Sequence, residues 1–103
     1  MNTLRDPKRR PTHPGEVLRE DVLPALGITQ GEIARRLGVS RLTVSELLRE
    51  KRAVSPDMAL RLARLLNTTP ESWLNMQQAM DLWELGRART RRYARIKPVR
   101  AAA

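Results

Sequence analysis

The 103-residue sequence contains no cysteine and only one histidine, His13. The lack of cysteine excludes a disulfide framework and a thiolate metal site, and a single histidine leaves little material for a zinc or acid–base centre. No apolar run approaches the roughly 18 residues of a membrane span, and the residues before Glu16 lack the apolar segment of a secretory signal. Catalytic motifs are also absent. We therefore expect a cytoplasmic protein that is not an enzyme and has no metal, cofactor or membrane partner.

Positive charge is abundant but concentrated at the two ends of the chain. Lysine and arginine number 20 against 11 acidic residues, a net charge of +9. Residues 1–12 carry +3 and residues 87–103 carry +7, whereas residues 13–86 carry −1. This distribution predicts one domain over residues 13–86, a basic N-terminal arm over 1–12 and an arginine-rich C-terminal tail over 87–103. The excess favours a polyanionic partner, with nucleic acid ahead of an anionic membrane.

Both charged ends are poor in core-forming residues, so we expect them to be mobile or only partly ordered. Two interpretations of the C-terminal tail remain open. It is either a solvated end that aids solubility, or an arm that adds phosphate contacts and steepens the salt dependence of DNA binding.

Apolar residues recur every three or four positions between residues 14 and 86, and the period-two alternation of strands is absent. The sequence therefore predicts an all-α fold. The five expected helices span Pro14 to Leu23, Gln30 to Leu37, Arg41 to about Glu50, residues 56–66 and residues 70 to about 85.

Local signals set the expected helix ends. Thr29, with Glu32 three residues later, predicts a capping box, and Ser40 is the expected cap of the next helix. Pro24 and Gly27 are expected to close the first helix, Gly38 to form a left-handed helix end, Asn67 to stop the fourth helix, and Gly86 to separate the fifth from the tail.

The segment from Gln30 to Arg49, QGEIARRLGVSRLTVSELLR, has the pattern of a helix-turn-helix. It needs a small residue where the helices approach, which is Ala34, and a turn residue that tolerates positive φ, which is Gly38. The apolar residues that lock the two helices together are Ile33, Leu37, Val39, Val44 and Leu47. All seven positions agree, which favours a helix-turn-helix over a plain helical hairpin.

The second helix of such a unit enters the major groove of DNA. Arg41 is the expected bidentate contact to guanine, Leu42 faces a thymine methyl group, and Gln30 reaches a phosphate. Glu46 either accepts from a cytosine amino group or pairs with a neighbouring arginine, and we favour the pairing. The complete set of predicted DNA-binding residues is Gln30, Ser40, Arg41, Thr43, Ser45, Arg49, Lys51 and Arg52, of which the last three are expected to contact the backbone.

One helix-turn-helix covers too little DNA for tight specific binding, so we expect a homodimer on a palindromic double-stranded operator. Four large residues, Trp73, Met76, Met80 and Trp83, form a stripe on the fifth helix. The stripe is either core packing or the dimer interface, and the sequence weighs the two equally.

Several segments together resemble the antitoxins of the HigA/VapI group, within the lambda-repressor-like (Xre) helix-turn-helix family. They are HPGE at residues 13–16, TQGEIARRLGVSRLTVSELLREK, SPDMALRLARLLN and ESWLNMQQAMDLW. The resemblance covers residues 11–85 and implies a five-helix domain, a homodimer, repression of its own promoter and neutralisation of a HigB-like toxin, an mRNA endonuclease. Many relatives have Gly-Lys after the recognition helix, where this chain has Glu50-Lys51, so we expect a different turn there.

A basic HigB-like toxin implies an acidic docking face. The candidates are Glu16, Glu20 and Asp21 on the first helix, or Glu71, Asp81 and Glu84 on the fifth. Besides an antitoxin, the sequence allows a stand-alone transcriptional regulator of the same fold, or a protein-interaction or RNA-binding module with a vestigial helix-turn-helix.

Overall fold

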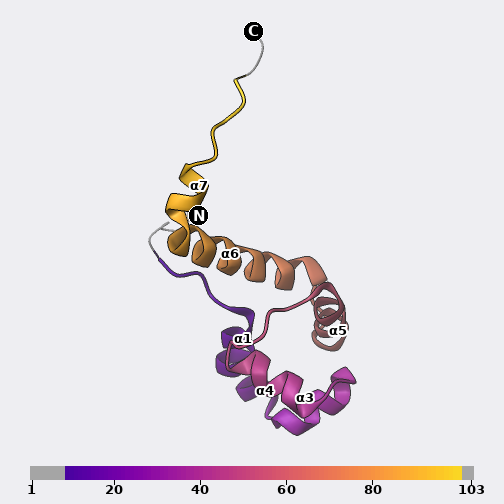
Figure 1. Cartoon of the computed structure of the whole chain (residues 1–103). Coiled ribbons are helices and arrows are strands. Elements are labelled where there is room, and N and C mark those ends of the chain that lie inside the picture. The colour runs from indigo at the N-terminus through magenta and orange to yellow at the C-terminus, as the bar shows by residue number, and fades with distance from the viewer. Residues whose placement is uncertain (1–8, 101–103) are drawn as a thin grey trace.

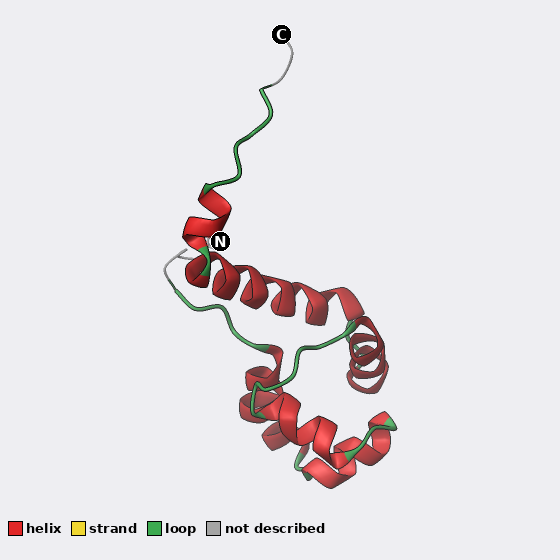
Figure 2. Ribbon diagram, in the orientation of Figure 1, coloured by secondary structure: helices red, strands yellow, loops and turns green. Residues whose placement is uncertain are grey.

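The computed structural model describes residues 9–100, in which helices joined by loops are the only regular secondary structure and no strand occurs (Figures 1 and 2). Most of the expected N-terminal arm, residues 1–8, and the last three residues lie outside the described part. The elements are α1 (Pro14–Val17), η1 (Leu18–Val22), α2 (Leu23–Leu26), α3 (Gln30–Leu37), α4 (Arg41–Leu48), α5 (Pro56–Leu66), α6 (Pro70–Ala88) and α7 (Thr90–Ala94).

The first helix is longer than predicted, because α1, η1 and α2 follow one another without a break from Pro14 to Leu26. The prediction that Pro24 helps to close it was wrong. Proline normally interrupts a helix by clashing with the carbonyl four residues earlier. Here the preceding turn is π-helical, with the N–H of Leu23 bonded to the carbonyl of Leu18, and Pro24 sits in the first turn of α2. The helix ends at Gly27 in the left-handed conformation, as expected.

The predicted helix-turn-helix is confirmed as α3 and α4. The Thr29 hydroxyl accepts from the Glu32 N–H at 3.1 Å, and the Ser40 hydroxyl accepts from the Thr43 N–H at 3.0 Å. The second half of the predicted capping box differs, because the Glu32 carboxylate accepts from Arg36 instead. Gly38 adopts φ 74° between the two helices.

One apolar core joins the helices. α4 packs against α3 and α1, and α5 packs against α3 and α6. All the inward residues predicted for the helix-turn-helix are buried or partly buried, and Ala59 and Leu62 of α5 are fully buried beside them. The back of α3 and α4 is therefore fixed to the protein, which leaves the opposite face of α4 outside.

The prediction that Gly86 separates the last helix from the tail was wrong, since α6 continues through it to Ala88 and α7 follows. Glycine in an exposed helix interior costs only about 1 kcal/mol. The Arg87 guanidinium also lies over the Trp83 ring, 4.7 Å from its centroid, which supports this turn. Asn67 ends α5 in the left-handed conformation, as predicted.

Candidate nucleic-acid interface

The outer face of α4 is polar and accessible. Arg41 and Leu42 are exposed, Thr43 and Ser45 are partly exposed, and Arg49 follows at the helix end. Leu42 is 61% exposed although it is apolar, which is what a contact to a thymine methyl group requires. None of the eight predicted DNA-binding residues is buried.

Arg41 lies at the point where the N-terminal ends of α3 and α4 meet. A Cβ atom added to Gly31 would lie 3.3 Å from its guanidinium carbon, so Arg41 crosses the first turn of α3 next to Gln30. At the same end the Ser40 and Thr43 hydroxyls share a hydrogen bond of 2.9 Å. A guanidinium and two hydroxyls are thereby gathered next to the first turn of α3, which is a suitable set for phosphate and base-edge contacts.

The basic side chains on and just after α4 differ in whether a carboxylate pairs with them. Arg52 donates to Glu46 at 2.6 and 3.1 Å, which confirms the favoured pairing of Glu46. Within residues 9–100, Arg41, Arg49 and Lys51 form no ion pair. These three side chains therefore keep their full charge for a polyanion, whereas Arg52 would have to leave Glu46 first.

Two arginines that the sequence did not single out hold the helix-turn-helix from behind. Arg61 of α5 donates to the carbonyl of Leu37 at 2.8 Å, at the end of α3. Arg19 of η1 donates to the carbonyl of Leu48 at 2.6 Å, at the end of α4. Cations at helix C-termini satisfy unpaired carbonyls and oppose the negative end of the helix dipole. Each helix of the unit is thus capped from another part of the chain.

Glu50 occupies the turn that follows α4. Its φ is 61°, the left-handed conformation that glycine adopts most easily. The N–H groups of Glu50 and Lys51 donate to the carbonyls of Leu47 and Glu46, which is a Schellman helix end. Glu50 therefore takes the backbone conformation that glycine adopts most easily.

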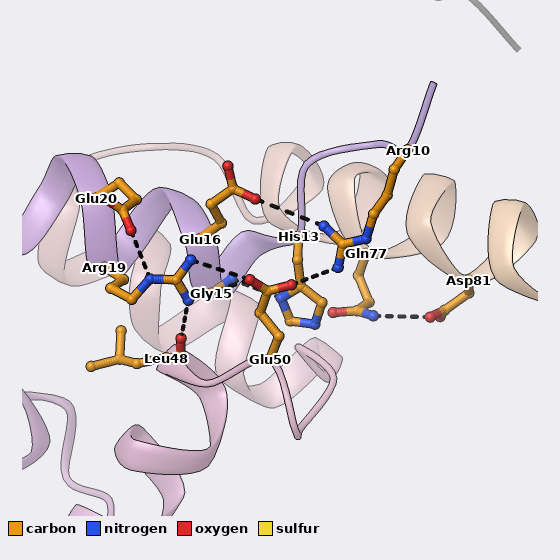
Figure 3. A network of polar contacts seen from close by, with 10 residues as sticks. All are labelled: Arg10, His13, Gly15, Glu16, Arg19, Glu20, Leu48, Glu50, Gln77 and Asp81. Atoms are coloured by element: carbon orange, nitrogen blue, oxygen red, sulfur yellow. Dashed lines mark hydrogen bonds and ion pairs between the residues drawn. The ribbon is translucent and has the colours of Figure 1, made fainter. Parts of the chain in front are cut away.

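The Glu50 carboxylate is held by two arginines (Figure 3). It accepts from Arg10 at 2.6 Å and from Arg19 at 3.3 Å, and Arg10 also lies 3.8 Å from Glu16. Hydrogen bonding from Arg10 is the main cause that holds the pKa of Glu50 below its ordinary value. The network joins the segment before α1, the first helix and the end of α4, and it offsets the conformational cost of a left-handed glutamate.

His13 caps the first helix. Its Nδ1 atom accepts from the Gly15 N–H at 2.9 Å, and the side chain is 5% exposed. Burial is the main cause that lowers the pKa of His13 from its ordinary value of 6.5, and the charge of Arg10 lowers it further. The neutral ring is therefore the form that caps the helix, because a protonated Nδ1 cannot accept this hydrogen bond.

This cap predicts a dependence of stability on pH. The folded protein binds the His13 proton more weakly than the unfolded chain does, so stability from His13 is complete above pH 6.5 and is lost as the pH falls toward the folded-state pKa. Between about pH 7.5 and pH 5.5, the unfolding free energy should fall by up to about 1.4 kcal/mol per pH unit more in the wild type than in His13→Asn. Asparagine caps a helix without titrating. Urea unfolding at both pH values measures the difference, and equal slopes for the two proteins would contradict it.

The stripe of large residues on α6 divides into two parts. Trp73 and Met80 are buried within the protomer, at 3% and 1% exposure, and the Trp73 indole donates to the Thr68 hydroxyl at 2.8 Å. Met76 and Trp83 are partly exposed. Leu82 and Leu85 are exposed on another side of α6. Within the described residues, the Trp83 indole nitrogen is buried without a hydrogen-bond partner.

Residues 9–100 contain no group of three or more acidic or histidine side chains that would hold a metal ion. No helix in that range is both long enough and apolar enough to cross a membrane.

Comparison with known proteins gives the chain a family. The helix-turn-helix family model matches residues 18–74. The antitoxin HigA-1 of Vibrio cholerae is 44% identical over 81 residues, 79% of this chain and 76% of the relative. A Haemophilus influenzae protein named as an uncharacterized helix-turn-helix transcriptional regulator is 40% identical over 77 residues, 75% of this chain and 72% of the relative.

A solved structure extends the likeness to the whole fold. The Pseudomonas aeruginosa antitoxin HigA, determined with the higBA promoter, superposes with a TM-score of 0.82 at 38% identity. The match covers 88% of this chain and all of that one. The resemblance drawn from the sequence is thereby confirmed, and these similar proteins are named as antitoxins or transcriptional regulators.

Proposed function

The chain belongs to the helix-turn-helix family and is similar to HigA antitoxins, and we propose that it is the antitoxin of a type II toxin–antitoxin pair. In this proposal a homodimer binds a palindromic operator in its own promoter, represses transcription, and neutralises a HigB-like mRNA endonuclease. The observation that carries it is the outer face of α4, where Arg41, Thr43 and Arg49 are accessible on a helix fixed from behind. The similar HigA structure with the higBA promoter supports the promoter as target.

In the DNA complex, α4 lies in the major groove and its side chains have separate tasks. Arg41 at the first turn donates two hydrogen bonds to a guanine, while Thr43 and Ser45 donate to bases or phosphates. Arg49 and Lys51 neutralise backbone phosphates beyond the helix end. Gln30 binds a phosphate at the start of α3, where the helix dipole is positive.

The proposed dimer contact is the exposed part of α6. Because Trp73 and Met80 fill the protomer's own interior, the part of the stripe left for a second copy comprises the partly exposed Met76 and Trp83, which lie seven residues apart on one face of α6. A two-fold contact there would also cover the part of the Trp83 ring that is exposed in the protomer. Two recognition helices about 34 Å apart would then meet one face of the operator.

The proposed toxin surface lies on the first helix. Arg10 and Arg19 partly neutralise Glu16 and Glu20, but Asp21 forms no ion pair within residues 9–100. Asp21 stands at the edge of an apolar groove of about 410 Å³, formed with the side chains Val17, Val22, Ala25, Leu26, Leu66, Trp73 and Met76. A basic toxin with an apolar anchor fits this groove better than it fits the acidic residues of α6, of which Asp81 is bonded to Gln77.

The test of DNA binding uses the double variant Arg41→Ala/Thr43→Ala and a duplex taken from immediately upstream of the chain's own reading frame. Loss of base contacts worth about 1–3 kcal/mol each should weaken specific binding at least tenfold. Binding to random duplex should change much less. The Ser40 cap uses the backbone N–H of Thr43, so the variant keeps its fold, which circular dichroism checks.

Lys51→Ala is the matched comparison. Loss of a phosphate contact should weaken the binding of specific and random duplex to the same extent and lower the salt slope by about one. If Arg41→Ala/Thr43→Ala leaves promoter affinity unchanged, α4 is not the recognition helix.

A stand-alone regulator is the second candidate, favoured by the 40% identity to the Haemophilus influenzae protein named as a transcriptional regulator. Co-expression with the neighbouring reading frame separates the two. An antitoxin restores growth that the neighbour alone arrests, and Asp21→Lys should weaken that rescue. A regulator without a toxin binds the promoter and has no such neighbour.

A further inference from the structure

The chain carries a second concentration of positive charge at the end opposite to α4. We call residues 87–100 the C-terminal basic segment. It includes the last two residues of α6, all of α7 and the residues after it. Its seven cations are Arg87, Arg89, Arg91, Arg92, Arg95, Lys97 and Arg100, and the last acidic residue of the whole chain is Glu84.

These cations differ from most arginines of the domain in having no carboxylate partner. Arg10, Arg19, Arg36, Arg52 and Arg61 all pair with glutamate or aspartate at 2.6 to 3.3 Å. Within residues 9–100, no cation of the C-terminal basic segment forms such a pair. The segment therefore keeps its charge available for an external polyanion.

The segment has a shaped surface rather than a plain extended tail. Its first half forms a hollow of about 430 Å³ lined by Arg87, Ala88, Arg89, Thr90, Arg91 and Arg92. Tyr93 follows Arg92 in the chain and is 43% exposed, and its N–H donates to the carbonyl of Arg89, one helical turn earlier, at 3.1 Å. An accessible aromatic ring thus stands among the arginines.

The position of the segment separates it from the proposed operator site. In Figure 1 α7 lies at the far end of α6, while α3 and α4 lie at the opposite end of the molecule. The longest dimension of the protein is 57 Å. A duplex bound by α4 would therefore not pass the C-terminal basic segment of the same protomer.

We propose that the C-terminal basic segment is a second nucleic-acid site, which binds single-stranded nucleic acid independently of α4. Arginines around the hollow bind the phosphates, and the Tyr93 ring stacks on an unpaired base. A duplex offers no free base face to this ring. A membrane surface is less suited, because α7 has only five residues and cannot present an amphipathic face to lipid.

The experiment measures binding of the full chain to a labelled oligouridine of about 20 nucleotides, long enough for one site, by fluorescence anisotropy over a range of salt concentrations. Arg91→Gln/Arg92→Gln should weaken this binding about tenfold and lower the salt slope by about 1.4, since each single-strand phosphate contact contributes about 0.7. Arg35→Gln/Arg36→Gln removes the same charge from another adjacent pair, on α3, and should leave the affinity within about twofold. Tyr93→Ala should weaken binding about tenfold, and Tyr93→Phe should retain it.

Competition tests the independence of the two sites. One equivalent of the promoter duplex, enough to occupy α4, should not displace oligouridine, and Arg91→Gln/Arg92→Gln should bind that duplex as the wild type does. The same measurement with oligodeoxyuridine shows whether the 2′-hydroxyl is used. The proposal is overturned if the two double variants lose the same amount of affinity for oligouridine, if the duplex displaces oligouridine, or if the segment binds only phosphatidylserine vesicles. None of these outcomes depends on whether the promoter duplex is bound specifically.

Discussion

Replacing Gly15 with alanine should unfold the protein far more readily than its single added methyl group suggests. An added Cβ would lie 1.9 Å from the carbonyl oxygen of Leu47, a backbone atom of α4. It would also lie 3.2 Å from Nδ1 of His13, the helix cap. Neither helix can yield locally, because α4 is buried on this side. We expect the unfolding free energy to fall by about 3 kcal/mol or more, a large part of a typical 5–15 kcal/mol.

Gly86→Ala is the matched control. It adds the same methyl group in an exposed helix interior with nothing within 4 Å, so it should raise the stability by about 0.5–1 kcal/mol. Thermal unfolding compares the two variants, and the melting temperature of Gly15→Ala should fall by roughly 15 °C. A melting temperature within a few degrees of the wild type would show that α1 does not approach α4 as closely as described.

The close approach at Gly15 explains part of the resemblance that the sequence displayed. In the HPGE segment, His13 caps the helix, Pro14 is buried in the first turn, and Gly15 permits contact with α4. Glu16 then faces Arg10. The four residues therefore fix the first helix against the proposed recognition helix, a packing role that the sequence pattern alone did not specify.

Local chemistry made the helix-turn-helix predictable. Thr29 and Ser40 cap the N-termini, and Gly38 ends α3, because each acts on backbone groups within a few residues of itself. The side-chain face of α4 followed from helical spacing alone. These predictions needed no knowledge of the tertiary structure.

The contacts that the sequence did not reveal join residues far apart in the chain. Arg61 reaches back 24 residues to Leu37, and Arg10 reaches forward 40 residues to Glu50. Nothing in the local sequence distinguishes these arginines from the others. The predictions at Pro24 and Gly86 failed for a related reason, because both residues normally end a helix. A π-helical turn accommodates Pro24, and the contact of Arg87 with Trp83 supports the turn that contains Gly86.

The turn between α3 and α4 provides the second large expected effect, in Gly38→Val. Gly38 has φ 74°, and the N–H groups of Gly38 and Val39 close the helix end on the carbonyls of Arg35 and Ala34. A left-handed conformation costs an ordinary residue roughly 1–2 kcal/mol, and a β-branched one more. The new Cβ would also lie 3.1 Å from the Arg61 guanidinium that caps α3. We expect a loss of about 2–4 kcal/mol of unfolding free energy, together with weaker binding of the promoter duplex.

Gly27→Val separates backbone strain from crowding, because Gly27 has φ 64° and nothing within 4 Å of an added Cβ. Gly27→Val should therefore lower the unfolding free energy only by the cost of the strained backbone. The excess loss in Gly38→Val then measures the displaced Arg61 contact, and in an Arg61→Ala background the two valine variants should become equally unstable. Urea unfolding of the six proteins tests this cycle. If the difference between the two valines persists without Arg61, the guanidinium does not hold the end of α3, and another contact must set the angle at which α4 meets DNA.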